Sequence, residues 1–356
     1  MQDFDDDAFL SIGLTRPIRQ LLNTLRFDDT TRLVRVTEVN RHTVRLHDGT
    51  DDYSARLLPA LVHELQAAGD ALAVGDWGLA RQEPDGACWL TDFLARSNAL
   101  SRRDADGRRH VLVSNVDTAL IVMGLDDDFS PRRLERFLAL VDASGVQPVV
   151  VLSKADLCAD VPAALARLEG RLPDRVPRLA LDGRSPAAAA QALAPWLLPG
   201  RTLVLIGSSG AGKSTLANAL IGQAVQDTGP TRQHDGRGRH TTTSRSLHRL
   251  SGGACLIDTP GVRALRPDAD AAALAASFGD IARLSLQCRF RDCRHAGEPG
   301  CAVRAAVDGD RVDNFLKLQR ELRRDALGLL DRRQQLAQWK ARARASRERL
   351  RSKRGA

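Results

Sequence analysis

The hydrophobic pattern of the 356-residue chain changes character along its length. Between residues 31 and 97, short β-rich runs are separated by turn signals such as Asp48-Gly49 and Asp85-Gly86, which is typical of a small barrel of roughly five strands. From residue 111, apolar strands alternate with amphipathic helices, and this alternation predicts a parallel sheet in an α/β domain. After about residue 271 the sequence becomes helical. The chain is long enough for two or three domains, each with its own core.

Composition places the boundaries between these regions. The first residues are acidic and show no clear core pattern, and the stretch after the barrel is polar and charged. The predicted order is an acidic N-terminal extension at 1–30, a barrel at 31–97, a linker at 98–110, the α/β domain at 111–275, a cysteine-containing domain at 276–320 and a basic helix at 321–356.

The net charge of +8 is unevenly distributed. Residues 288–356 hold 19 Lys and Arg against 9 Asp and Glu, so they carry +10 and the other residues sum to −2. This excludes a uniformly basic coat and indicates a basic face or arm that meets a polyanion. Apolar runs fall far short of the ~20 residues that span a bilayer, and the acidic N-terminus is unlike a signal peptide. We expect a cytoplasmic protein without membrane contact.

A glycine-rich segment between a predicted strand and a predicted helix fits the pattern G-x-x-x-x-G-K-[ST]. Its glycines let backbone amides wrap a phosphate, which the positive end of the next helix stabilises. In this pattern Lys213 reaches the β- and γ-phosphates, and the Ser214 hydroxyl is a magnesium ligand. A simple glycine turn is the alternative. The predicted nucleotide-binding residues here are Gly207, Ser208, Ser209, Gly210, Ala211, Gly212, Lys213, Ser214 and Thr215.

Two further motifs follow predicted strands. DTPG at 258–261 would place Asp258 near magnesium and let the Gly261 amide donate to the γ-phosphate, although DTPG alone is a common turn. SKAD at 153–156 fits the guanine-reading Asn-Lys-x-Asp motif of GTPases, with Asp156 accepting from the base and the Lys154 stem on its ring. An unpaired buried carboxylate is costly, so Asp156 would discriminate against adenine.

The first residue of SKAD departs from the GTPase motif. Ser153 stands where asparagine is expected, and this is predicted to weaken one polar contact to the base or to the phosphate loop. Ala155 completes the predicted base-binding segment. A solvated Lys-x-Asp triplet is the alternative. SKAD also precedes the phosphate loop, whereas ordinary GTPases have the reverse order, so we interpret the chain as circularly permuted.

Three cysteines and one histidine cluster near the C-terminus. The spacing Cys288-x₄-Cys293-x-His295-x₅-Cys301 supplies four ligands that suit tetrahedral zinc. A chance cluster and an iron–sulfur site are the alternatives. Because all four protein ligands are used, we interpret the zinc as structural. The other cysteines, Cys88, Cys158 and Cys255, are interpreted as packing residues.

The order of these motifs is similar to that of the ribosome small-subunit-dependent GTPase family, known as RsgA or YjeQ. The similarity covers roughly residues 31–320. It implies a circularly permuted P-loop GTPase domain of α/β class, an N-terminal OB-fold barrel and a C-terminal helical zinc-binding domain. The motifs that carry it are VGDW at 74–77, SKAD at 153–156, GSSGAGKST at 207–215, GRGRHTTT at 236–243, DTPG at 258–261 and CRFRDCRH…GC at 288–301.

The segment GRGRHTTT has the character of a first switch. We favour Thr242 as a magnesium ligand in the GTP state, and a flexible basic loop that binds only rRNA is the alternative. After DTPG, Val262 stands where a Ras-like enzyme has a glutamine that orients water. Intrinsic hydrolysis should therefore be slow. His240 is the candidate for orienting water once rRNA holds the loop.

The resemblance implies a GTPase that acts in late maturation of the small ribosomal subunit, with hydrolysis stimulated by the subunit and coupled to release, and we expect it to be a monomer. Its cofactors would be GTP or GDP, magnesium and one zinc. Trp77 and Trp89 are predicted to be core residues rather than stacking platforms, so contact with rRNA would rely on arginine. The alternatives are a P-loop ATPase or kinase, and an rRNA-binding module with a largely inactive nucleotide domain.

Overall fold

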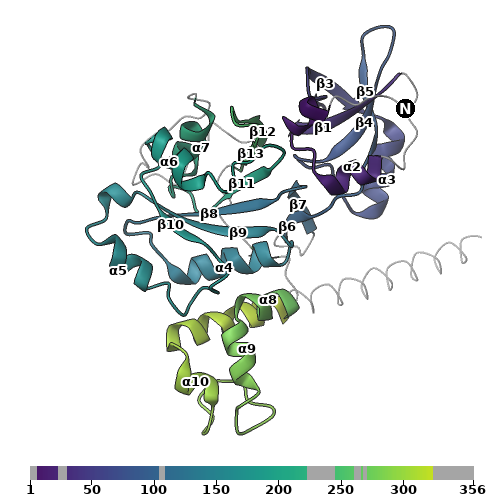
Figure 1. The fold of residues 1–356 in the computed structure, drawn as a ribbon. Helices are drawn as coiled ribbons and strands as arrows, with labels where there is room; N and C mark the ends of the chain where they lie inside the picture. Colours follow the sequence, from purple (N-terminus) through teal and green to yellow (C-terminus); the bar gives the residue numbers. More distant parts are fainter. Residues whose placement is uncertain are drawn as a thin grey trace, which may run out of the picture.

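The computed structural model describes residues 6–22, 30–103, 109–222, 245–259, 266–267 and 271–323. Three units follow one another in this part of the chain: a β-barrel, an α/β domain and a helical C-terminal unit (Figure 1).

The first unit is a closed barrel, as the strand pattern predicts. Its strands are β1 (Thr31–Val39), β2 (Val44–His47), β3 (Asp52–Leu57), β4 (Trp77–Gln82) and β5 (Cys88–Phe93). Their order is β1-β2-β3-β5-β4, and β4 pairs back with β1. Strands β3 and β5 run parallel. Helix α3 (Pro59–Ala68) joins β3 to β4 and buries Leu61 and Leu65 in the barrel core.

The second unit is built on strands in the order β10-β9-β8-β11-β13-β12, and the sheet continues into the barrel because β12 pairs antiparallel with β1. All neighbours are parallel except β12, which is antiparallel to β13. The strands are β8 (Thr118–Gly124), β9 (Gln147–Ser153), β10 (Arg178–Ala180), β11 (Thr202–Ile206), β12 (Ser246–Arg249) and β13 (Cys255–Asp258).

Helices cover both faces of this sheet, so its central strands are apolar throughout. Helix α4 (Pro131–Asp142) lies on one face, and α6 (Pro186–Leu193) and α7 (Lys213–Ile221) lie on the other (Figure 1). Along β8, Ile121 and Met123 join the core beneath α4, whereas Leu120 and Val122 join the core beneath α6 and α7. A short helix, α5 (Val161–Ala166), adds Ala164 to the first of these cores.

The third unit contains α8 (Ala271–Ser277), α9 (Gly279–Ser285), α10 (Ala302–Ala306) and further helical residues over 309–323. Its small core includes Phe278, Ile281 and Val303, and it also takes in Ala139 of α4. The unit therefore shares its core with the α/β domain.

A buried ion pair joins the third unit to α4. Nη1 of Arg311 donates to Oε1 of Glu135 at 3.0 Å, and its Nε and Nη2 donate to the two carboxylate oxygens of Asp280 at 2.9 and 2.7 Å. Asn314 donates to the carbonyl oxygen of Arg132 at 3.1 Å. Burial raises the pKa of Glu135, and the hydrogen bond from Asn314 and the charge of Arg311 oppose that shift.

Another buried arginine joins the barrel to the α/β domain. Arg35 of β1 is 0% exposed. Its guanidinium donates to the carbonyl oxygens of Ile12, Gly75 and Asn115 and to Oγ1 of Thr202, the first residue of β11. Burial lowers the pKa of Arg35, and nearby Cys255, Asp117 and Asp76 oppose that shift. One side chain of β1 thus contacts four other segments that are distant in sequence.

The stretch 98–110, which composition predicts to be a linker, contains regular structure instead. Strand β6 (Ala99–Arg103) pairs with β7 (Arg109–Ser114), and β14 (Arg266–Pro267) pairs with β6 to complete a small sheet. Only Leu100 and Ser101 are buried in the described part of β6, so the apolar alternation is too short to reveal a strand. The expectation of a linker is corrected.

The N-terminal residues also pack into a core, contrary to the expectation of an extension. Helices α1 (Asp6–Leu10) and α2 (Arg16–Leu22) and the turn between them bury Ile12, Leu14 and Ile18 against Trp77. These helices are too short for apolar periodicity to be visible in the sequence. Trp77 is a core residue, as predicted, whereas Trp89 is only half-buried.

The residues that the structure describes include no helix of sufficient length and hydropathy to cross a bilayer.

Replacing the buried arginine should destabilise the protein. Arg35→Met leaves the Thr202 hydroxyl and three carbonyl groups without their donor, which should cost about 3 kcal/mol or more and lower the thermal midpoint by roughly 6–12 °C. The matched control on the same strand is Arg32→Met, because the Arg32 side chain is 53% exposed. Calorimetry checks both variants, and equal midpoints for the two would contradict the role assigned to Arg35.

Candidate nucleotide-binding site and metal centre

The glycine-rich loop leaves the carboxyl end of β11 and leads into α7. Gly207 has φ of +150°, and a Cβ atom there would lie 2.2 Å from the carbonyl oxygen of Val122 on β8. Gly210 and Gly212 have φ of +81° and +87°. These conformations strongly favour glycine. The backbone of the loop is thus shaped as phosphate binding by main-chain amides requires.

Lys213, the first residue of α7, turns back over this loop. It is 6% exposed, and its Nζ donates to the carbonyl oxygens of Gly207 at 3.0 Å and Ser208 at 2.7 Å. Burial lowers the pKa of Lys213 to about 8, and the charge of Asp258 opposes that shift. The loop therefore surrounds a cation, as a site for a phosphate group requires.

Asp258 ends β13 beside the loop. It is 1% exposed and lies opposite Leu205 of β11 in the parallel pairing. Next to it, Thr259 donates its hydroxyl to the carbonyl oxygen of Leu205 at 2.5 Å. The structure thus brings Asp258 to the same edge of the sheet as Lys213.

The SKAD motif reaches this edge from β9. Ser153 is buried, and its Oγ donates to the carbonyl oxygen of Ala211 in the glycine-rich loop at 2.6 Å. We expected serine in place of asparagine to weaken one contact to the base or to the loop. The structure shows a direct side-chain bond from this position to the loop.

The other polar residues of SKAD are held by side chains from neighbouring loops. Lys154, with φ of +58°, forms an ion pair with Asp126, which follows β8. Although burial opposes it, the hydrogen bonds from Lys154 and from the backbone of Asp128 lower the pKa of Asp126. Asp156 lies in a 3₁₀ turn (Ala155–Leu157) and accepts a hydrogen bond from Arg184, which follows β10.

Several predicted site residues lie outside the described part of the chain. These are the switch residues His240 and Thr242 and, in DTPG, Gly261. The remaining members of the predicted site lie on the loop or in the first turn of α7: Ser208, Ser209, Gly210, Ala211, Gly212, Ser214 and Thr215.

Sequence reasoning missed several residues at this edge. Arg133, in the first turn of α4, donates to Oγ of Ser208 at 3.0 Å and is held by Asp128. Another is Asp126, the partner of Lys154, which lies with Asp128 in the acidic segment 126–128. A signal was present in the sequence: polar residues directly after a buried parallel strand lie at the carboxyl edge of the sheet, where ligands bind.

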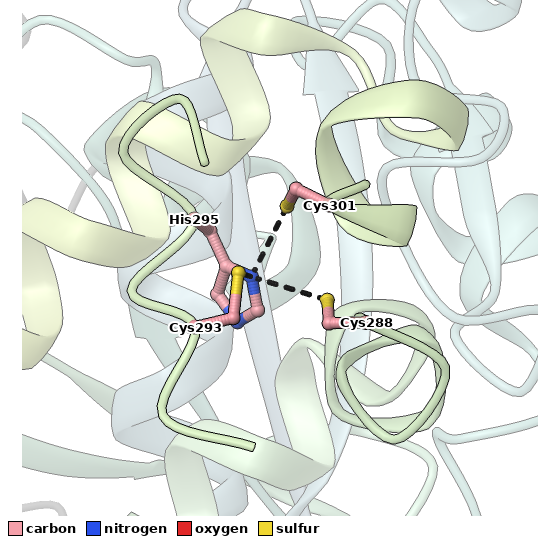
Figure 2. Close-up of side chains that lie close together, drawn as sticks. All are labelled: Cys288, Cys293, His295 and Cys301. Carbon is pink, nitrogen blue, oxygen red and sulfur yellow. Dashed lines mark hydrogen bonds between the residues drawn. The ribbon is translucent and has the colours of Figure 1, made fainter. Parts of the chain in front are cut away.

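The predicted metal ligands come together in the third unit. Figure 2 shows the side chains of Cys288, Cys293, His295 and Cys301 pointing toward one another. Nδ1 of His295 lies 3.7, 3.5 and 3.4 Å from the three Sγ atoms in that order, and all four ligand atoms lie within 4.8 Å of one another. Tetrahedral zinc with sulfur and nitrogen ligands needs separations of about 3.5–3.8 Å. The donor set and its size therefore fit such an ion.

Glu298, which sequence reasoning did not single out, organises the loop that carries two of these ligands. Its carboxylate accepts hydrogen bonds from the backbone amides of Arg294, Ala296 and Gly297 at 3.0, 2.8 and 3.2 Å. A hydrogen bond from its own amide, together with these three bonds, lowers the pKa of Glu298 to about 2. His295 has φ of +57°, so the charge-assisted bonds of Glu298 hold an uncommon backbone conformation at a ligand position.

The strands and motifs match a GTPase fold in which the order along the chain is permuted. The strand that ends at SKAD comes first, and the phosphate loop and DTPG follow on later strands of the same sheet. The molecule is thus a circularly permuted GTPase. A family model described as RsgA GTPase matches residues 93–267. The small ribosomal subunit biogenesis GTPase RsgA of Xanthomonas oryzae pv. oryzae (strain PXO99A) is 49% identical over 257 residues, which are 70% of this chain and 69% of that protein. The chain belongs to the RsgA GTPase family.

Other relatives agree with this assignment. The protein of the same name from Xylella fastidiosa (strain 9a5c) is 50% identical over 256 residues, which are 70% of this chain and 73% of that one. Among solved structures, YjeQ from Thermotoga maritima is similar with a TM-score of 0.59 and 24% identity, covering 82% of this chain and 98% of that one. YloQ, described as a circularly permuted GTPase, has a TM-score of 0.54, 24% identity and coverages of 84% and 98%. These structural similarities concern the fold.

The metal centre can be tested by removing one ligand. Cys301→Ser should lose the bound metal during dialysis against a chelator, because Cys301 supplies one of four ligands. The wild-type chain and the control Cys158→Ser should each keep one equivalent, since Cys158 lies outside the cluster. Elemental analysis measures the metal content. Retention of one equivalent by Cys301→Ser would contradict the assignment.

Proposed function

We propose that this protein is a GTPase that binds the small ribosomal subunit and acts in its late maturation, with hydrolysis stimulated by the subunit and coupled to release. The observation that carries the nucleotide part is the hydrogen bond between Ser153 and Ala211, which joins the SKAD motif to the phosphate loop. Membership of the RsgA family supports the ribosomal part, because relatives bear the name small ribosomal subunit biogenesis GTPase.

The residues at the sheet edge divide the recognition of GTP between them. Asp156 accepts hydrogen bonds from the guanine edge, and the stem of Lys154 lies against the ring. The backbone amides of the loop and Nζ of Lys213 hold the phosphates. Ser214 and Thr242 are proposed magnesium ligands, with Asp258 contacting the ion through water. Magnesium supplies positive charge to the phosphates when bound.

Hydrolysis needs a residue that orients water, and Val262 cannot do so. We infer that His240 takes this role, and that Gly261 donates its amide to the γ-phosphate. Contact with rRNA would hold the first switch in place. Slow turnover without the subunit follows, because the water-orienting group is positioned only on docking.

The flanking domains supply the contacts with RNA. The barrel strand order and the helix between β3 and β4 support an OB-fold, and the Cys/His cluster supports one structural zinc. The run 340–354 holds eight basic residues and one acid, which suits binding to rRNA phosphates with a steep dependence on salt. In this proposal, GTP positions the basic C-terminal region on rRNA and hydrolysis loosens it.

Replacing the proposed guanine-reading carboxylate should change the base preference. Asp156→Asn should bind GDP about 100-fold more weakly or worse and should gain affinity for xanthosine 5′-diphosphate, because an amide complements the altered base edge. The control Asp174→Asn, at a fully exposed side chain, should leave both affinities unchanged. Titration with labelled nucleotides measures them. Equal binding of ADP and GDP by the wild-type chain would instead favour an ATPase or kinase.

Turnover with and without ribosomal subunits tests the partner. Purified small subunits should raise the rate of GTP hydrolysis by about 10-fold or more, since docking completes the catalytic group. Large subunits serve as the matched control and should have no such effect. Lys213→Ala should abolish both basal and stimulated turnover, because it removes the phosphate-binding cation. Stimulation of equal size by both subunits would contradict the proposed specificity.

A further inference from the structure

Arg184 lies beside the SKAD motif at the carboxyl edge of the sheet. Strands β9 and β10 are parallel neighbours, and the loops that follow them stay together: the backbone amide of Leu181 donates to Leu152 at 2.9 Å, and that of Ala155 donates to Leu181 at 3.3 Å. Arg184 lies in the loop that follows β10, and its side chain extends toward the 3₁₀ turn that contains Asp156. Its Nη2 donates to Oδ2 of Asp156 at 2.6 Å.

A second carboxylate holds Arg184 in this position. Asp182 accepts the backbone amide of Arg184 at 2.9 Å and its Nε at 3.1 Å, both on Oδ1. Nη2 also lies 3.4 Å from Oδ2 of Asp182. The guanidinium therefore bridges two carboxylates that belong to adjacent loops. Its direction toward Asp156 is set by Asp182, although the Arg184 side chain is 65% exposed.

The guanidinium and the guanine edge present the same chemistry to a carboxylate. Each is a planar group with neighbouring N–H donors, and a carboxylate accepts such a pair side by side. When a carboxylate oxygen of Asp156 accepts a hydrogen bond from Arg184, the lone pair that it uses cannot accept a hydrogen bond from the base. We propose that Arg184 and guanine compete for Asp156, so that Arg184 lowers the affinity for guanine nucleotides and slows their association. This inference rests on the guanine-reading role proposed for Asp156.

The competition makes Arg184 a residue that sets nucleotide affinity without touching the phosphates. Exposed ion pairs are weak, so Arg184 should lower the affinity for guanine nucleotides only modestly. This decrease should become smaller at high salt, because salt screens the ion pair. A different outcome is expected if Arg184 instead supports the base, because its removal would then weaken binding.

Stopped-flow binding of fluorescently labelled GDP to the full chain tests the proposal. Arg184→Ala should bind GDP about two- to fivefold more tightly than the wild-type chain at low salt, with the gain in the association rate. The matched control is Arg201→Ala, an exposed arginine paired with Asp117 at the amino end of β11. This variant removes the same charge at the amino edge of the parallel strands, whereas SKAD lies at their carboxyl edge, and it should leave the affinity for GDP unchanged. Unchanged or weaker GDP binding by Arg184→Ala would overturn the competition.

A second pair of variants links the effect to Asp156 itself. In Asp156→Asn, the affinity for xanthosine 5′-diphosphate should not change when Arg184→Ala is added, because a neutral amide does not form the ion pair. An equal gain in this background would assign the effect to charge alone and overturn the proposal. The two proposals fail separately. If the wild-type chain shows no preference for guanine nucleotides, the role of Asp156 is contradicted. If that preference is present but Arg184→Ala binds GDP no more tightly, only the competition is contradicted.

Discussion

The buried guanidinium of Arg35 is the constraint on which the arrangement of the first two units depends. A charged group without access to water must find acceptors within the protein, and Arg35 finds them in the N-terminal turn, in the barrel, in the segment between β7 and β8, and at Thr202. Thr202 begins the strand that ends at the phosphate loop. The barrel is therefore hydrogen-bonded to the first residue of the strand that leads into the nucleotide site. Any other placement of the barrel would leave this charge without its acceptors.

A comparable constraint acts at the opposite side of the α/β domain. Glu135 and Arg311 are both buried, and each would be costly without the other. They fix the helical unit that carries the metal ligands against α4. The same helix begins next to the phosphate loop, where Arg133 donates to Ser208. Helix α4 thus contacts the nucleotide site at one end and the metal-carrying unit along its length. The helical unit is also connected to the nucleotide site by the chain itself, which runs from DTPG at 258–261 into that unit.

The individual motifs show how far sequence reasoning reaches. The phosphate loop and Asp258 were each recognised from a local motif, and they lie at one sheet edge because the carboxyl ends of parallel strands share an edge. The metal ligands were predicted to cluster because they are close in sequence. The N-terminal helices and β6 were missed, since each buries only a few residues and shows no clear period. For Ser153, a comparison with the GTPase motif pointed to a weakened contact, and only the packing of β9 against the loop revealed its bond to Ala211.

By itself the sequence determined the chemistry available to this protein: which residue types could bind phosphate, guanine and a metal, and in what order along the chain. Such motifs are readable because their members are adjacent and their local backbone sets the geometry. Only the tertiary structure decided the partners of the isolated charges, such as Arg35 with Thr202, Arg311 with Glu135 and Arg184 with Asp156. These partners are far apart in sequence, and burial or the meeting of two loops selects them. No local pattern encodes such a choice, because the acceptors exist only once the separate segments have packed together.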